Sequence, residues 1–349
     1  MEIKSSSRSV GAAPPFEVGP FRPADAQGIV QLFRSVYGDG YPIRVFYDEK
    51  KLTEANAAGE YYSIVARTPD GRVIGVEHLF RSAPFDRLYE VGAGLVDREY
   101  RKLGVNNQMM QFIFDVWVPA QDNIEGTFGE AVCNHTHMQK IIRGFAHVET
   151  ALEVALMPAE AYDAERSARG RVASLAVFRC YKSKSHTIYL PAQYDKELRF
   201  LYSELDDPRS FEAAAEDLPR NLPSEAEMMV FDFAKVARVA VQVAGSDFES
   251  YSESLEKQAL DRHAVVIQVW LKLGSRSVGS AVDILRRRGY FLGGLLPRWF
   301  DEDGLLMQKP LVEPNLDEIQ LHSDHAKEIL AIVRKDWERA QQTGGGSWK

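Results

Sequence analysis

The feature that most limits the possible folds of this chain is a run of three closely spaced strand signals that leads into a loop and a helix. The three signals are Tyr61–Ala66, Val73–Phe80 and Leu88–Val96, and the turn Pro69-Asp70-Gly71 separates the first two as in a β-hairpin. The third signal continues into the loop Arg98–Asn106, and Asn107–Trp117 then carries apolar residues at helical spacing. A strand meander followed by a strand–loop–helix unit predicts a mixed α/β fold.

Shorter signals on both sides complete this pattern. Before the meander we expect an extended segment at Phe16–Phe21, an amphipathic helix that opens at Pro23, and a second helix over Asp48–Ala58. After it we expect a strand over Gly126–Cys133, a helix over Thr136–Arg143 and a strand over Glu149–Met157. The fold class is therefore α/β in the α+β sense, with a mostly antiparallel mixed sheet flanked by helices.

The second half of the chain repeats the closing pattern of the first. Ala264–Leu273 reads as an apolar strand, and Ser277–Arg288 reads as a helix that ends at Gly289. Gly289 lies 145 residues after Gly144, which ends the corresponding helix of the first half, so we predict a duplicated domain. The predicted organisation is a flexible N-terminus (1–15), a first domain (16–160), a second domain (161–320) and a C-terminal part (321–349) with a helix at Asp324–Gln342 and a flexible tail.

Composition narrows the classes of partner and compartment. The 349 residues suit two domains, and a net charge of −8 argues against a nucleic-acid partner held by phosphate contacts. The only cysteines, Cys133 and Cys180, exclude a disulfide framework and a thiolate zinc cluster. Without a signal-peptide pattern or an apolar run of membrane length, we expect a cytoplasmic protein, monomeric or homodimeric, that does not bind membranes.

The loop after the third strand has the composition of an anion site. A helix N-terminus offers N–H groups that lack acceptors, and Gly104 allows the backbone to approach an anion closely. Arg101 and Lys102 add positive charge. Together these residues predict a cradle for a pyrophosphate, and the alternative is a turn glycine beside solvated basic side chains.

The same residues carry a family resemblance. Arg101-x-x-Gly104-x-Asn106 resembles the pyrophosphate loop Arg/Gln-x-x-Gly-x-Gly/Ala of the GNAT superfamily of acyl-CoA-dependent N-acyltransferases, with Asn106 in place of the third, small residue. The resemblance covers Phe16 to about Pro158 and implies acetyl-CoA as the co-substrate and no metal. It also implies a cofactor-binding set of Leu95 and Val96, whose backbone would pair with the pantetheine, the loop residues Arg101, Lys102, Leu103, Gly104, Val105, Asn106 and Asn107, and Asn134.

The second half resembles the same superfamily only in part. Its strand Ala237–Val243 leads into Ala244–Phe248, where the glycine motif is absent and Asp247 would repel phosphate. The resemblance therefore implies two tandem GNAT-like domains, each with a mostly antiparallel mixed sheet flanked by helices, the second having a degenerate cofactor loop.

Three residues are candidates for the chemistry. Transfer to an amine needs a base, and Glu90 lies on the strand before the loop with apolar-leaning neighbours, where burial would raise its pKa. Glu130, one strand over, is the second candidate; a solvated strand carboxylate is the alternative for Glu90. Lys140 stands where the superfamily often has a tyrosine that protonates the leaving thiolate. We interpret His135 and His137 as helix-entry residues, since no third metal ligand accompanies them.

Two further interpretations complete the reading. Pro297–Gly304 predicts a packed hairpin that turns at Asp303-Gly304, with a ligand pocket lined by Arg298 and Trp299 as the alternative. For the whole chain we predict an N-acetyltransferase acting on an amine of a small metabolite. The alternatives are acetylation of a protein lysine or N-terminus, and a non-catalytic acyl-CoA-binding sensor or assembly module.

Overall fold

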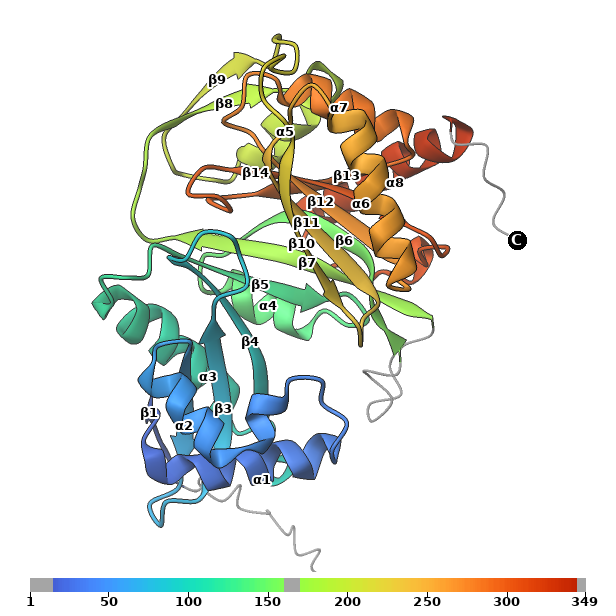
Figure 1. Ribbon diagram of the computed structural model, residues 1–349. Helices are drawn as coiled ribbons and strands as arrows, with labels where there is room; N and C mark the ends of the chain where they lie inside the picture. Colours follow the sequence, from blue (N-terminus) through green and yellow to red (C-terminus); the bar gives the residue numbers. More distant parts are fainter. Residues whose placement is uncertain (1–14, 160–169, 344–349) are drawn as a thin grey trace, which may run out of the picture. The chain divides into compact units, whose positions relative to one another are not determined.

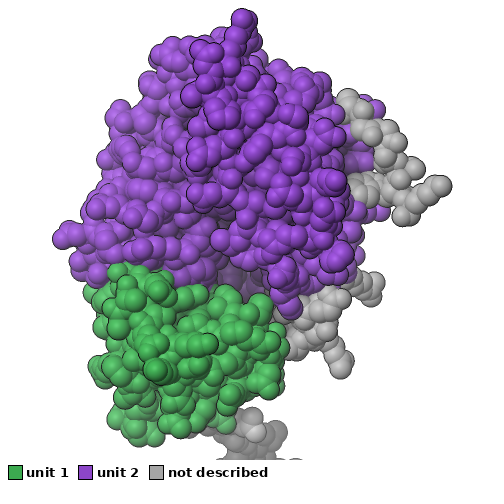
Figure 2. Space-filling model, in the orientation of Figure 1, with its two compact units in different colours: residues 1–79, 93–117 green, residues 80–92, 118–349 purple. Residues whose placement is uncertain are grey.

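The computed structural model describes residues 15–159 and 170–343, and the chain divides into two compact units (Figures 1 and 2). The first unit comprises residues 1–79 and 93–117, and the second comprises residues 80–92 and 118–349. The strands β3 and β4 contribute residues to both units. Among the described residues, no helix is both long enough and apolar enough to cross a membrane.

The first unit contains the N-terminal meander and its helices. Its elements are β1 (Glu17–Pro20), α1 (Ala26–Tyr37), α2 (Glu49–Ala57), β2 (Tyr61–Arg67), β3 (Val73–Phe80), the end of β4 (Leu88–Val96) and α3 (Val105–Gln111), which continues as a π-helix, η4 (Phe112–Trp117). The short 3-10 helices η1 (Pro23–Asp25), η2 (Arg44–Tyr47) and η3 (Arg98–Tyr100) lie between them. The sheet order in this unit is β1-β2-β3-β4, and β1 and β2 are antiparallel.

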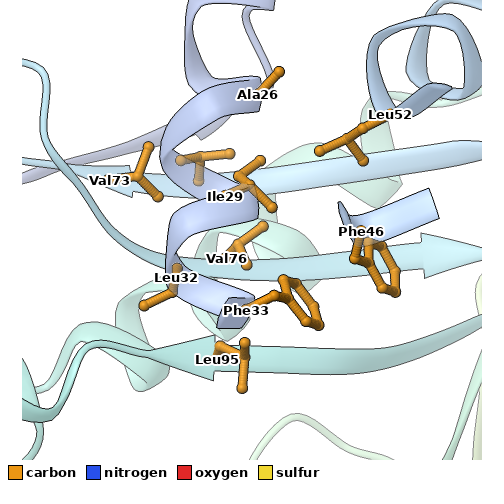
Figure 3. Close-up of a cluster of buried hydrophobic side chains, with 10 residues drawn as sticks. Ala26, Ile29, Leu32, Phe33, Phe46, Leu52, Val73, Val76 and Leu95 are labelled. Carbon is orange, nitrogen blue, oxygen red and sulfur yellow. The ribbon is translucent and has the colours of Figure 1, made fainter. Parts of the chain in front are cut away.

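An apolar cluster holds α1 and α2 on this sheet (Figure 3). Ile29 and Phe33 of α1 point toward Val76 of β3, and Phe33 stacks on Phe46 with ring centroids 4.5 Å apart. The start of α1 is fixed by a buried ion pair between Asp25 and Arg67, 2.5 Å apart. The spacing that predicted an amphipathic helix is thus the spacing that fills this core.

The second unit carries the remaining elements. Its strands are the start of β4 with β5 (Gly126–Val132), β6 (Val148–Pro158), β7 (Arg171–Cys180), β8 (His186–Leu190), β9 (Arg209–Ala213), β10 (Glu225–Phe231), β11 (Val236–Val243), β12 (Val266–Lys272), β13 (Phe291–Leu296) and β14 (Gly304–Pro310). Its helices are α4 (His137–Arg143), α5 (Asp195–Tyr202), α6 (Phe248–Asp261), α7 (Val278–Arg287), α8 (Asp324–Thr343) and the 3-10 helices η5 (Val118–Ala120), η7 (Ala192–Tyr194) and η8 (Leu316–Glu318).

Two four-stranded groups in this unit have the same order and the same strand directions. The order is β4-β5-β7-β6 in one group and β11-β12-β14-β13 in the other. In each, the first pair is parallel and the other pairs are antiparallel. A helix follows the first strand of each parallel pair, α3 after β4 and α6 after β11. We call Leu88–Cys180 the first repeat and Val236–Pro310 the second repeat.

The two repeats share one interior. β6 pairs antiparallel with β13, which joins the two groups in one sheet. Phe128 of the first repeat packs against Trp299 of the second, with ring centroids 5.0 Å apart, and Trp299 packs against Trp270 at 4.8 Å. Because strands far apart in the sheet order touch in this way, the sheet curls and encloses a common core.

The predicted class is confirmed: the fold is mixed α/β, with a large, mostly antiparallel mixed sheet flanked by helices. Most of the predicted helices and strands agree with those found to within two residues at each end. The predicted boundary over Pro158–Arg171 falls in the connection from β6 to β7, where residues 160–169 lie outside the described residues. The predicted flexible segments, except Pro15, also lie outside them.

Two details of the prediction are wrong. The helix predicted from Asn107 begins at Val105, because Gly104 makes the turn that starts it. The hairpin of β13 and β14 does not turn at Asp303-Gly304: Gly304 already belongs to β14, and the connection has left-handed residues at Arg298 (φ 56°) and Asp301 (φ 64°). The Asp303 side chain is buried and accepts a hydrogen bond from Arg209 Nε at 2.7 Å.

Candidate functional site

The loop after β4 turns over an open glycine. Gly104 has a φ of 82°, in the left-handed region that favours glycine, and α3 begins at the next residue. A β-carbon placed on Gly104 would meet no heavy atom of the described residues within 4 Å. Since the first N–H groups of a helix lack acceptors within it, this turn presents backbone donors beside open space.

The charge of this loop is positive on balance. Its exposed cations are Arg98, Arg101 and Lys102. Its two carboxylates, Asp97 and Glu99, both contact Arg72 Nη2, at 2.6 and 3.1 Å. Arg72 therefore offsets the acidic pair, and the cations of the loop remain to attract an anion. Of these, Arg101 also donates a hydrogen bond to the Val96 carbonyl at 3.4 Å, which ties its side chain to the end of β4.

The strand that leads to the loop is distorted in its middle. Ala93 has a φ of 56°, a conformation that costs about 1–3 kcal/mol for a residue with a side chain. A left-handed residue within a strand turns its backbone groups away from the regular ladder, and such strained residues cluster at functional sites. Of the two predicted strand-end residues, Leu95 buries its side chain in the cluster under α1 and Val96 is half-buried. A role in binding a cofactor would therefore use their backbone groups, as the resemblance implies.

Glu77 on β3 is a buried carboxyl group that the sequence interpretation missed. Its carboxyl group occupies the space that a β-carbon on Gly94 would take, so Glu77 could not keep this position beside a larger residue there. Burial raises the pKa of Glu77 to about 8, so this side chain holds a proton at neutral pH. The signal was present as one acidic residue within the apolar strand run Val73–Phe80.

Glu90 belongs to a cluster of carboxyl groups in the second unit. Its Oε2 accepts a hydrogen bond from Ser82 Oγ at 2.5 Å. Glu130 on β5 and Glu153 on β6 both accept hydrogen bonds from Arg238 Nη2, at 2.6 and 3.1 Å. The structure thus brings together the two predicted base candidates, Glu90 and Glu130. The charge of Glu130 affects the pKa of both Glu90 and Glu153.

Burial and like charge make the cluster bind protons tightly. Burial, with a further contribution from Glu130, raises the pKa of Glu90 to about 8, and the hydroxyl of Ser82 and the charge of Arg238 act in the opposite direction. The same two causes raise the pKa of Glu153 to about 7. A base whose pKa lies near the working pH is the kind that proton transfer favours, so Glu90 fits the predicted role.

Most of the other predicted residues lie on α4, before it, or around the start of α3. Lys140 has an exposed side chain on α4. Asn134 is half-buried between the end of β5 and α4, and His137 is the first residue of that helix. Leu103 and Asn106 are half-buried, Val105 is buried and Asn107 is exposed, all at the start of α3. Arg298 and Trp299 are buried: Arg298 bonds to Glu125 and Asp301, and Trp299 packs against Phe128 and Trp270.

The corresponding loop of the second repeat is closed by the chain itself. A β-carbon on Gly245 would collide with the backbone of Leu222–Ser224, the segment that precedes β10. The N–H of Gly245 donates to Ser224 Oγ at 3.0 Å, and the N–H of Ser246 donates to the Leu222 carbonyl at 3.3 Å. Asp247 accepts from the Ser224 N–H at 2.7 Å, and hydrogen bonds from Ser224 hold its pKa below the ordinary value. The N–H groups of Gly245 and Ser246 are thus already bonded within the chain, and the Asp247 carboxylate is negatively charged, which disfavours an anion at this loop.

Comparison with known proteins gives structural matches only. No family model and no curated protein matches the sequence. Among solved structures, the chain is similar to ribosomal-protein-S5-alanine acetyltransferase from Vibrio fischeri (14% identity, 47% of this chain and 92% of that chain, TM-score 0.37). It is also similar to spermidine N-acetyltransferase from Vibrio cholerae, solved with CoA and spermine (13% identity, 47% and 95%, TM-score 0.38). The proposed function therefore rests on the residues of this chain.

Proposed function

We propose that this protein is an acyl-CoA-dependent N-acyltransferase whose first repeat holds acetyl-CoA and transfers the acetyl group to an amine of a small metabolite. The observation that supports this best is the combination found along β4 and the loop that follows it. A carboxyl group with a pKa near 8, a left-handed residue, and a positively charged turn over an open glycine follow one another within Glu90–Gly104.

The proposed roles follow from the chemistry of each group. The backbone N–H groups at Gly104 and the start of α3, with Arg101 and Lys102, bind the pyrophosphate of the co-substrate. The turned backbone at Ala93 is suited to polarise an acyl carbonyl, because N–H groups that leave a ladder can donate to an oxygen outside it. The acceptor nitrogen bonds to the acyl carbon, and the carbon–sulfur bond breaks, so that CoA leaves as the thiolate with the bonding electron pair. Glu90 takes the proton that leaves the nitrogen.

Glu90 remains the first candidate for the base. Glu130 is engaged by the guanidinium of Arg238, whereas the bonded partner of Glu90 is the neutral hydroxyl of Ser82. With a pKa of about 8, Glu90 is ionised in only a minor part of the molecules at pH 7, and the fraction rises through pH 8. The rate of transfer should therefore increase with pH over this range.

The second repeat, in this proposal, is a GNAT-like domain without a cofactor of its own. Its strand order repeats that of the first repeat, and its loop is bonded to Leu222–Ser224. Because β7 pairs with both β5 and β6, we place the end of the first domain after Cys180 instead of at residue 160.

One observation favours a different function. Lys140 is exposed on α4, and it stands where the resemblance implies a tyrosine as the acid. A protein that binds acyl-CoA without transferring the acyl group would have no need of such an acid. We keep the acyl-CoA-binding sensor as the second candidate for this reason.

Thiol release tests the proposal. The full chain is incubated with acetyl-CoA and a panel of small amines, polyamines included, and with lysine-containing peptides as the alternative acceptors. We expect thiol release with a small amine, and a loss of about 100-fold or more in Glu90→Gln, since base catalysis typically contributes this much. Glu227→Gln, on an exposed position of β10, is the matched control and should keep the full rate.

The other outcomes separate the candidates. CoA binding without thiol release for any acceptor would favour the sensor, and release with peptides alone would favour protein acetylation. Full activity in Glu90→Gln would remove Glu90 from the role of base.

A further inference from the structure

The carboxyl cluster of the first repeat contains a cation that comes from the second repeat. Arg238 lies on β11, yet its Nη2 lies 2.6 Å from Glu130 on β5 and 3.1 Å from Glu153 on β6. These partners are 108 and 85 residues away in the chain. The curl of the sheet is what brings them together.

Arg238 is held in one position from several sides. Its Nε donates to Gln268 Oε1 on β12 at 2.8 Å, and Gln268 Nε2 in turn donates to Glu153 Oε1 at 2.8 Å. The guanidinium also lies over the rings of Phe231 and Trp270, 5.3 and 5.8 Å from their centroids. A planar guanidinium with several fixed donors is suited to such a place, and it is only 8% exposed.

The charges in this cluster cannot all be satisfied by one cation. Three carboxyl groups, of which Glu90 and Glu130 are half-buried and Glu153 is buried, face a single guanidinium, and like charges close together disfavour one another. The charged groups that act on Glu90 are Glu130 from β5, Glu153 from β6 and Arg238 from β11, and the polar group is Ser82. The two carboxylates oppose ionisation of Glu90, and Arg238 is the one cation of this set that favours it.

We propose that the second repeat completes the reaction site of the first, with Arg238 as a positioning residue that holds Glu130 and Glu153 and thereby governs how readily Glu90 accepts the proton of the acceptor amine. This rests on the proposed function, because the proton in question is the one released by acyl transfer. The second repeat would then contribute to the reaction through Arg238, although it binds no cofactor itself.

The direction of the effect follows from charge. Without Arg238, the carboxylates around Glu90 lose their counterion, so the pKa of Glu90 rises further. The carboxylate form of Glu90 then appears only at higher pH. The rise of the rate with pH should therefore move upward in Arg238→Gln, by about one pH unit, which is the low end of what a neighbouring opposite charge contributes.

The pH profile of the full-length enzyme is the first test. Arg238→Gln should lose rate at pH 7 and recover most of it at high pH, and Arg238→Lys should return the profile toward that of the wild type. Glu153→Gln removes a like charge and should shift the profile in the opposite direction. Arg262→Gln, at an exposed arginine of the same unit, is the matched control and should leave the profile unchanged.

A second readout does not depend on activity. The carboxyl resonance of Glu90, assigned through Glu90→Gln, is titrated by NMR in the wild type and in Arg238→Gln. We expect its midpoint to rise in the variant. An unchanged midpoint, or a rate lowered equally at every pH, would overturn this proposal. A wild type that transfers no acyl group while the midpoint still moves would overturn the proposed function instead.

Loss of a buried cation could unfold the chain, since an unpaired buried charge costs about 3–5 kcal/mol. The double variant Arg238→Met/Glu153→Gln removes the cation together with one of its partners. Glu130 then remains near Glu90 without a counterion, so the midpoint of Glu90 should again lie above that of Glu153→Gln alone. A folded double variant whose midpoint equals that of Glu153→Gln would overturn the proposal.

Discussion

In the first repeat, β4 passes into α3 over Gly104, which has open space above it; in the second, β11 passes into α6 over Gly245, which is covered by the backbone of Leu222–Ser224. The two connections occupy the same place in two copies of one strand order. The first is bordered by cations, and the second carries Asp247 at the start of its helix. A duplicated topology therefore does not duplicate the site.

The strands that lead into these loops differ as well. β4 contains Ala93 in the left-handed region, whereas no residue of β11 has a positive φ in this fully described strand. The ladder of β11 with β12 runs over five residue pairs, from Val236↔Val266 to Ala240↔Trp270, and the ladder of β4 with β5 covers Leu88–Glu90. Regular pairing in the second repeat leaves the backbone of β11 bonded within the sheet, where it stabilises the fold and is not available to a ligand.

The largest expected effect concerns the open loop. Gly104→Glu should abolish CoA binding, because it places a carboxylate where the phosphates would lie and forces a side chain into a left-handed conformation. Calorimetric titration with CoA measures the affinity. Gly71→Glu is the matched control, since Gly71 also has a positive φ and open space around it but lies in an exposed turn. Unchanged affinity in Gly104→Glu would remove the loop from the site.

A substitution in the closed loop at Gly245 should lower the stability of the protein and should not affect CoA binding. Gly245→Ala forces a β-carbon against the Leu222 carbonyl, so we expect the free energy of unfolding to fall by about 2–3 kcal/mol, as in overpacked sites. Gly104→Ala adds only backbone strain, about 1 kcal/mol. Urea denaturation of both variants gives the comparison. Equal losses would show that the two loops are packed alike.

A third contrast concerns β3 and β10, the strands that precede β4 and β11 in the chain. β3 carries the buried Glu77, whereas β10 alternates exposed and half-buried residues. Because the pKa of Glu77 is about 8 in the folded protein and lower in the unfolded chain, the folded state keeps a proton that the unfolded state releases between about pH 4.5 and 8. Its contribution to stability therefore falls as the pH rises through that range.

Glu77→Gln should remove this fall in stability with rising pH, because glutamine does not ionise. Between pH 5 and pH 8.5 the stability of the variant relative to the wild type should increase by about 4 kcal/mol. Thermal or urea unfolding at several pH values measures it, with the exposed Glu60→Gln of the same unit as the control. A stability difference that does not change with pH would show that the Glu77 carboxyl group does not titrate as described.

Much of the first repeat could be predicted from the sequence because its signals are local. Alternating apolar strands, a proline–glycine turn and a basic glycine loop each extend over a few neighbouring residues. The strands β8, β9 and β10 and the helices α5 and α6 were not predicted. β9 and β10 have no buried residue, so no apolar run marks them. The helices α5 and α6 do bury residues at helical spacing, so their signal was present in the sequence and was missed. The duplicated domain was inferred from the strand–helix pattern at Gly289, and the strand order of the second repeat supports it.

The site was predictable to the same extent. Gly104 and its flanking cations, and Glu90 on the strand before them, were found from residue type and position. Arg238 and Gln268 were not, because each is one polar residue within an apolar strand and its partners are distant in sequence. Only the curl of the sheet, which depends on packing between the repeats, brings them to the glutamates.

The stoichiometry of CoA binding tests the difference between the repeats most directly. Calorimetric titration of the full-length protein should give one CoA per chain, bound by the open loop of the first repeat. Two CoA molecules per chain would show that the loop at Gly245 also binds, and no binding would show that the loop at Gly104 does not; either result would contradict the proposed division of roles between the two repeats.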